Sequence, residues 1–189
     1  MGNRRLSRKR LYQVEKLGQK VDLESGAGIE DTIVSATQHR QGNELITEIA
    51  VDLGTSKAVI SSATQDRDPI GVVSGGSAVV TQLTVAKFGH ITEVRVVCVE
   101  VASSLADIDL EFGSTGDGVN DTADGGTPTS ITTNCCATIG ADTSVAYDNT
   151  ATLANKYLYI CNGSSDTPDP FTAGKLLIYI HGFVAPDDL

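Results

Sequence analysis

The strongest constraint on the fold of this 189-residue chain is the alternation of apolar and polar residues along its apolar stretches. Residues 44–53 show it most clearly, with Leu45, Thr47, Ile49 and Val51 at every second position. Side chains alternate between the two faces of a β-strand, so this period indicates a strand with one buried face. Clusters of Gly, Ser, Asp and Pro separate such stretches, as expected for turns.

This pattern predicts an all-β fold of seven to nine strands, an antiparallel β-sandwich with jelly-roll-like connections, or a barrel as the alternative. The eight predicted strands are Thr32–Ala36, Glu44–Leu53, Lys57–Ser61, Ala78–Ala86, Ile91–Val101, Asp107–Phe112, Leu153–Cys161 and Lys175–Phe183. Ile91–Val101 is apolar on both faces, so we expect a central strand that is covered on both sides. In Asp107–Phe112 we expect the apolar side chains inside and the three acids, Asp107, Asp109 and Glu111, in solvent.

Charge divides the chain into two parts. The first twenty residues hold seven of the 14 Lys and Arg residues against one Glu, which is a side-chain charge of +6, whereas the remainder carries −16. We therefore predict a basic N-terminal arm and linker over residues 1–30 and a β-sandwich domain over 31–189. The residues predicted to bind a partner through the arm are Arg4, Arg5, Arg8, Lys9, Arg10, Leu11, Val14, Leu17 and Val21.

Four apolar residues of the arm, Leu11, Val14, Leu17 and Val21, follow one another at spacings of three, three and four. This period is that of one stripe on a short amphipathic helix, which would order on docking. A disordered tail with chance periodicity is the alternative. Residues 25–28, Ser-Gly-Ala-Gly, indicate a flexible joint between arm and body.

Several classes of function are disfavoured by composition. No stretch of about 18 apolar residues suggests a membrane span, and the basic start lacks the apolar core of a signal peptide. An acidic body without aromatic residues interleaved in the arm makes nucleic acid a poor partner. Cys98, Cys135, Cys136 and Cys161 show no C-x-x-C spacing, so we expect reduced and mostly buried thiols.

No catalytic motif is present, and we predict neither an enzyme nor a cofactor. The best metal candidate is the loop that carries Asp117, Asp121 and Asp124, because calcium needs several converging oxygen ligands. The loop lacks the ligand spacing of an EF-hand, and a solvated loop with Asx-turns is the favoured interpretation. The pair Asp107 and Asp109 resembles the paired carboxylates of glycosidases, but a role in keeping the strand's outer face hydrated is favoured.

Tyr157 and Tyr159 share one face of a predicted strand. They could stack on a sugar, which would make the body a carbohydrate-binding adhesion module. A place in the core or in an oligomer interface is the favoured interpretation.

The chain resembles small virion structural proteins of tailed phages, especially those that infect marine cyanobacteria and other marine bacteria. The residues that carry the resemblance are Met1–Arg10, Ile46–Leu53, Ala78–Leu83, Gly89–Ile91, Cys98–Val101, Asp107–Leu110, Asn155–Ile160 and Ala173–Phe183.

The resemblance implies a capsid decoration, or cement, protein on the capsid exterior of the virion. Its partners would be the major capsid protein and two further copies of itself in a homotrimer, without nucleic acid or membrane. A head fibre, a neck component or a tail adaptor is the alternative within the virion.

Overall fold

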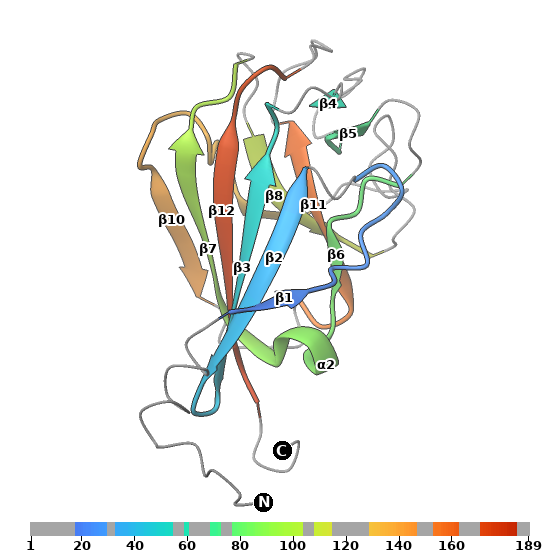
Figure 1. The fold of residues 1–189 in the computed structure, drawn as a ribbon, viewed down its shortest axis with the longest axis vertical. Helices are drawn as coiled ribbons and strands as arrows, with labels where there is room; N and C mark the ends of the chain where they lie inside the picture. Colours follow the sequence, from blue (N-terminus) through green and yellow to red (C-terminus); the bar gives the residue numbers. More distant parts are fainter. Residues whose placement is uncertain are drawn as a thin grey trace, which may run out of the picture.

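The computed structural model describes residues 18–29, 33–54, 59–60, 69–72, 77–103, 108–114, 129–146, 153–162 and 171–184. Within these ranges the chain is almost entirely β-structure (Figure 1). The predicted fold class is confirmed.

The larger sheet has six antiparallel strands in the order β1-β2-β3-β12-β7-β10 and forms the front layer of Figure 1. Its central strands pair over long registers, with Ile178 of β12 opposite both Ile49 of β3 and Val96 of β7. The strands are β1 Gln19–Val21, β2 Val34–Gln41, β3 Glu44–Asp52, β7 His90–Glu100, β10 Asp142–Ala146 and β12 Lys175–Phe183.

The second sheet has four antiparallel strands in the order β6-β11-β8-β9 and lies behind the first. Its strands are β6 Thr81–Leu83, β8 Ile108–Gly113, β9 Thr129–Thr132 and β11 Lys156–Asn162. A separate two-stranded sheet consists of β4 Val59–Ile60 and β5 Gly71–Val72. The two main layers confirm the sandwich, whereas its jelly-roll-like connectivity stays a prediction.

One continuous apolar core fills the space between the two main sheets. The larger sheet contributes the alternate residues of its long strands, and the second sheet contributes those of β8 and β11. The central members are Ile49, Val51, Val94, Val96, Leu176, Ile178, Ile180, Ile108, Leu110, Leu158 and Ile160. The faces assigned from the alternation of residues 44–53 and 107–112 are therefore those that point inward.

Two predictions about exposure are wrong. The strand β7 is second from the edge of its sheet, and Val99 on its outer face is 46% exposed, so β7 is not covered on both sides. Conversely, Asp109 and Glu111 of β8 are buried instead of facing solvent. The outer face of the second sheet is itself covered, since Tyr159 and Cys161 on this face are fully buried and form a second small apolar cluster with Val79.

The predicted strand Ala78–Ala86 is interrupted after β6 by the one-turn helix α2, Val85–Phe88. Thr84 caps this turn, since its hydroxyl accepts a hydrogen bond from the Lys87 N–H. Gly89, with φ of 69°, ends it and reverses the chain into β7. Local capping thus overrides the β-branched pattern of this stretch.

Helix α2 rests against a bulge in β12, and the contact requires glycine at position 182. A Cβ atom built on Gly182 would lie 1.8 Å from the carbonyl oxygen of Phe88, where no side-chain carbon fits. The chain therefore approaches itself here backbone to backbone, at the end of the sandwich where the described chain also ends (Figure 1).

We predict that Gly182→Ala lowers the free energy of unfolding by about 3 kcal/mol, because the backbone of either β12 or α2 must move. Urea unfolding measures the loss. Gly42→Ala is the control: Gly42 has φ of 64° but an added Cβ meets nothing within 4 Å, so only the left-handed backbone costs about 1 kcal/mol. Equal losses in the two variants would contradict the close approach.

Candidate functional site at the root of the N-terminal arm

The segment 18–29 attaches the chain to both sheets. Its first part is β1, which pairs with β2 at the edge of the larger sheet, with Val21 opposite Ala36. The chain then crosses to the second sheet, as the blue trace between β1 and β6 shows in Figure 1. There the backbone carbonyl of Leu23 accepts the hydroxyl of Thr81 at 2.7 Å, and the N–H of Gly26 donates to the carbonyl of Val79 at 2.9 Å.

This attachment corrects the predicted boundary at residue 30 and the predicted joint at residues 25–28. Leu23 and Ile29 are 5% and 6% exposed and belong to the main core. The glycines serve close packing instead of flexibility, since a Cβ on Gly26 would lie 2.3 Å from the carbonyl oxygen of Ser77. Residues 18–29 are thus part of the body, and only residues 1–17 remain as candidates for an arm.

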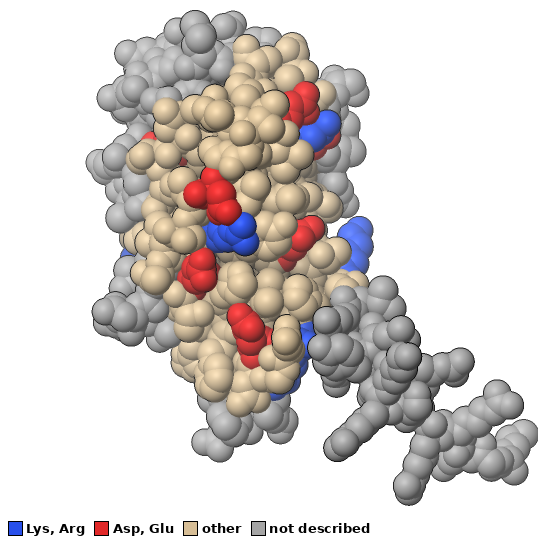
Figure 2. Space-filling view, turned by 90° about the vertical axis from the view of Figure 1, so that its left-hand side faces the viewer, with Lys and Arg blue, Asp and Glu red and all other residues tan. Residues whose placement is uncertain are grey.

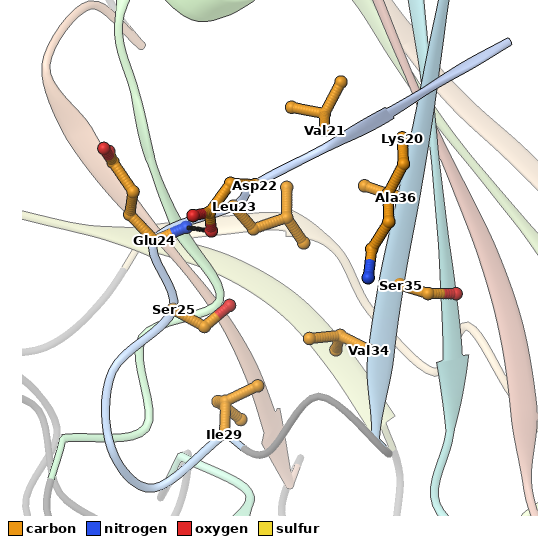
Figure 3. A pocket seen from close by; sticks show the side chains of 10 residues that line it. All are labelled: Lys20, Val21, Asp22, Leu23, Glu24, Ser25, Ile29, Val34, Ser35 and Ala36. Carbon is orange, nitrogen blue, oxygen red and sulfur yellow. Dashed lines mark hydrogen bonds between the residues drawn. The ribbon is translucent and has the colours of Figure 1, made fainter.

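A groove of about 470 Å³ lies between this segment and β2 (Figure 3). Apolar side chains form much of its wall, and polar side chains stand around them. The apolar members are Val21, Leu23, Ile29, Val34 and Ala36, and the polar ones are Lys20, Asp22, Glu24, Ser25 and Ser35. The groove therefore lies directly beside the point where the described chain begins, after residue 17.

The turn that forms one side of the groove is fixed by local polar contacts. The Asp22 carboxylate accepts the N–H of Glu24 at 2.9 Å, which supports the left-handed conformation of Glu24 with φ of 52° (dashed in Figure 3). The Lys87 ammonium then joins α2 to the turn, at 2.8 Å from a Glu24 carboxylate oxygen and 3.1 Å from the Leu23 carbonyl. The geometry of the groove is thus set by both sheets and by α2.

The one hydroxyl group at this turn of the groove is already used within the fold. The Ser25 hydroxyl donates to the Val80 carbonyl at 2.6 Å, which uses it as a structural link between the segment and the second sheet. Figure 3 shows that the Lys20 side chain lies along β2, with its amine directed toward the end of this strand that carries Val34 and Ser35. The groove thus combines an apolar wall with one ammonium group, from Lys20, and two carboxylates, from Asp22 and Glu24, at its margin.

Val21 is the only predicted arm residue within the described ranges. It lies in the strand β1 and packs against the core, so the helical stripe does not extend to it. The other eight, Arg4, Arg5, Arg8, Lys9, Arg10, Leu11, Val14 and Leu17, lie outside the described residues. So do Asp117, Asp121 and Asp124 of the candidate calcium loop.

Tyr157 and Tyr159 share one face of β11, as the alternation predicts, but differ in exposure. Tyr159 is fully buried, whereas Tyr157 is half-buried and packs at the margin of the same small cluster. The pair therefore does not form an aromatic platform for a sugar. For Tyr159 the core interpretation holds within a single chain.

Sequence reasoning missed a buried acidic pair on the same sheet face. Asp109 and Glu111 stand beside Cys161 and Tyr159 in the register of β8 and β11. The Asp109 carboxylate accepts the N–H of Asn134 at 2.7 Å and so holds the turn after β9. Burying a carboxylate is costly unless hydrogen bonds or charges compensate it, so this contact indicates a structural role. No signal within the strand itself distinguishes it from a solvated face.

The outer face of the larger sheet carries more acid than base. Strands β3, β12, β7 and β10 hold six acidic residues, Glu44, Glu48, Asp52, Glu93, Glu100 and Asp142, and two basic ones, Arg95 and Lys175. Figure 2 shows the β10 side, where charged side chains of both signs adjoin one another on a mostly uncharged surface.

Both basic residues of these four strands are held by acids. The Arg95 guanidinium binds the Asp142 carboxylate with 2.7 Å between Nε and Oδ1, and this hydrogen bond lowers the pKa of Asp142 and raises that of Arg95. Lys175 lies 3.1 Å from Glu100, and this contact raises the lysine pKa. The surplus on this face is therefore acidic, as the composition of the body predicts.

The chain matches no family model, and comparison with curated proteins and with solved structures gave no match either. Among the described residues no three potential metal-ligating side chains come together. None of the helices in the described ranges is long and apolar enough to cross a membrane.

We predict that Leu23→Ala lowers the free energy of unfolding by about 2–4 kcal/mol, because it removes a buried side chain from the main core. Ala27→Ser, in the same segment at an exposed position, is the control and should change stability by less than about 0.5 kcal/mol. Chemical denaturation of the full chain measures both. If Leu23→Ala proved as neutral as the control, residues 18–29 would be a linker after all.

Proposed function

We propose that this chain is a structural protein of a tailed-phage virion, and specifically a decoration protein that attaches to the outer capsid shell through its arm. The observation that carries the proposal is the double attachment of the arm's root. Because β1 is paired with the larger sheet and residues 22–29 are bonded to the second sheet, a load on the arm is passed to both layers of the body.

The resemblance to virion proteins supports the proposal, and the residues that carry it lie mostly in the strands that build the two main sheets. The quoted segments include most of β3, β11 and β12, together with parts of β7 and β8, which are strands of both main sheets. These residues would specify the body, while position in the virion would depend on the arm and on the outer surface.

The difference in charge between the arm and the body favours first contact through the arm. Residues 1–17 hold six Lys and Arg residues and one Glu, whereas the described outer face of the larger sheet has an acidic surplus. The body therefore repels an acidic shell surface that the arm attracts, so the arm would make first contact. Fully extended, 17 residues reach at most about 60 Å, enough to cross onto a neighbouring capsid subunit.

Self-association into a trimer is part of the proposal, supported by an apolar group at one end of the larger sheet. Val99, Val101 and Ile139 are exposed there, with Ile139 at 69%. They lie close together, because the N–H of Gly140 donates to the carbonyl of Cys98. Apolar side chains gathered in this way are typical of a subunit contact.

We predict that the protein is present at hundreds of copies per virion of the phage that encodes it. A decoration protein follows the surface lattice of the shell, so its copy number is set by the lattice. Quantitative mass spectrometry of purified virions, scaled to the major capsid protein, measures the ratio. Six or twelve copies would point to the neck or tail instead, and absence from the particle would overturn the proposal.

We further predict that charge and burial in the arm act on different rate constants. Replacing Arg4, Arg5, Arg8, Lys9 and Arg10 by Gln should slow association with heads that lack the protein by about tenfold or more at low salt. Replacing Leu11, Val14 and Leu17 by Ser should instead speed dissociation, with a loss of affinity of about 100-fold or more.

Association and dissociation can be followed by surface plasmon resonance on immobilised heads, with the full-length chain throughout. Lys156→Gln, which removes one positive charge from the body, is the control and should bind as the wild type does. Unchanged kinetics in both arm variants would show that the shell is bound by the body alone.

A further inference from the structure

Two of the four cysteines, Cys98 and Cys136, meet at the corner where the chain passes from the second sheet to the larger one, and Cys135 precedes Cys136 in the chain. Cys135 and Cys136 lie in the connection between β9 and β10, and Cys98 lies on the inner face of β7. All three are buried. Sequence spacing alone does not bring Cys98 to the vicinal pair, because 38 positions separate it from Cys136.

The vicinal pair divides its contacts between the two sheets. Cys135 faces the second sheet, where both its N–H and its thiol donate to the carbonyl of Ile108, at 2.7 and 2.9 Å. Cys136 faces the larger sheet, where its thiol donates to the carbonyl of Glu100 at 3.0 Å. Its sulfur lies 3.4 Å from that of Cys98.

The surrounding backbone fixes this approach. The N–H of Cys98 donates to the carbonyl of Ala141, and the N–H of Gly140 donates to the carbonyl of Cys98, both at 2.9 Å. On the other side, Asp109 holds the N–H of Asn134 next to the pair. Cys136 and Cys98 are therefore presented to each other by bonded backbone on both sides, not by chance contact of mobile side chains.

We propose that Cys98 and Cys136 are a cross-linking site, at which a disulfide forms when the chain folds in the presence of a small-molecule disulfide such as oxidised glutathione. One thiolate attacks the glutathione disulfide and releases one glutathione thiol. The other cysteine then attacks the mixed disulfide, forms the Cys98–Cys136 bond and releases the second glutathione. The two cysteines are oxidised, one glutathione disulfide is reduced to two thiols, and the two cysteine protons pass to the departing thiolates.

The geometry selects this pair over the two others at the corner. A disulfide has an S–S distance of about 2.05 Å, so the two sulfurs, 3.4 Å apart, need to approach by only roughly 1.3 Å. Cys135 is directed away, toward Ile108. A bond between the adjacent Cys135 and Cys136 would strain the peptide that joins them.

Burial determines when the reaction takes place. Burial, followed by the hydrogen bond with Cys98, raises the pKa of Cys136 to about 12, and burial raises that of Cys135 to about 12 as well. Only the thiolate attacks a disulfide, so the folded protein should react slowly near neutral pH. The bond therefore forms during folding, while the corner is still open, and is protected once the corner has closed.

The bond would join β7 of the larger sheet to the turn that is anchored on β8 of the second sheet. A link across 38 positions restricts the unfolded chain considerably, and we expect it to raise the melting temperature by about 5–15 °C. This inference is independent of the proposed function, since it concerns folding of the isolated chain.

The test is to refold the reduced full-length chain in a glutathione redox buffer, block free thiols with N-ethylmaleimide, and digest with trypsin and Glu-C without reduction. Val96–Glu100 then carries only Cys98, and the fragment of residues 112–156 carries Cys135 and Cys136. We expect mass spectrometry to find these two fragments linked, and we expect a reductant to reverse the gain in melting temperature.

Single Cys→Ala variants identify which cysteine forms the disulfide with Cys98. The link should persist in Cys135→Ala and Cys161→Ala and disappear in Cys136→Ala. Two results would overturn the proposal: unlinked fragments from the refolded wild type, or a link that survives in Cys136→Ala and is lost in Cys135→Ala. The wild-type digest and Cys135→Ala decide the question even where Cys136→Ala folds poorly.

Discussion

Burial of one apolar layer between two antiparallel sheets is the constraint on which the remaining structure depends. Across the three long strands of the larger sheet, Ile49, Ile178 and Val96 lie side by side in one row of the register and point into the layer. A slip of one residue in β12 would turn its whole apolar set toward solvent. The register is therefore fixed by burial, and the positions of the loops, edges and corners follow from it.

The same layer holds residues 18–29 of the N-terminal segment as part of the fold. Leu23 and Ile29 lie in the core, so residues 18–29 cannot leave the body without exposing apolar surface. The polar contacts of this segment then select its path: the Thr81 hydroxyl and the Lys87 ammonium both reach the carbonyl of Leu23. Burial supplies the stability of the arm's root, and hydrogen bonds supply its geometry.

The sequence was sufficient to predict a strand where the alternation of apolar and polar residues within that strand indicates its buried face. Long alternating stretches predicted β3, β7, β8, β11 and β12 and the inward faces of β3 and β8. It was insufficient where structure depends on distant partners. The three-residue β1 carries no readable period, and the exposed edge strand β10 lacks an apolar face. The buried state of Asp109 and Glu111 depends on the cover over the second sheet, which no pattern within β8 reveals.

The candidate site shows the same division between local and distant information. Val21 fits a helical spacing in the sequence, yet pairing with β2 places it in a strand, because an open sheet edge offers hydrogen bonds that an isolated turn of helix lacks. Likewise, the sequence around Gly26 predicts a flexible joint, but in the structure the carbonyl of Ser77 occupies the space that a side chain at position 26 would need. Residues 18–29 are therefore bound to the fold. Under the proposed function, changes before Gly18 should act on binding and changes after it on stability, so the two effects are separable in one chain.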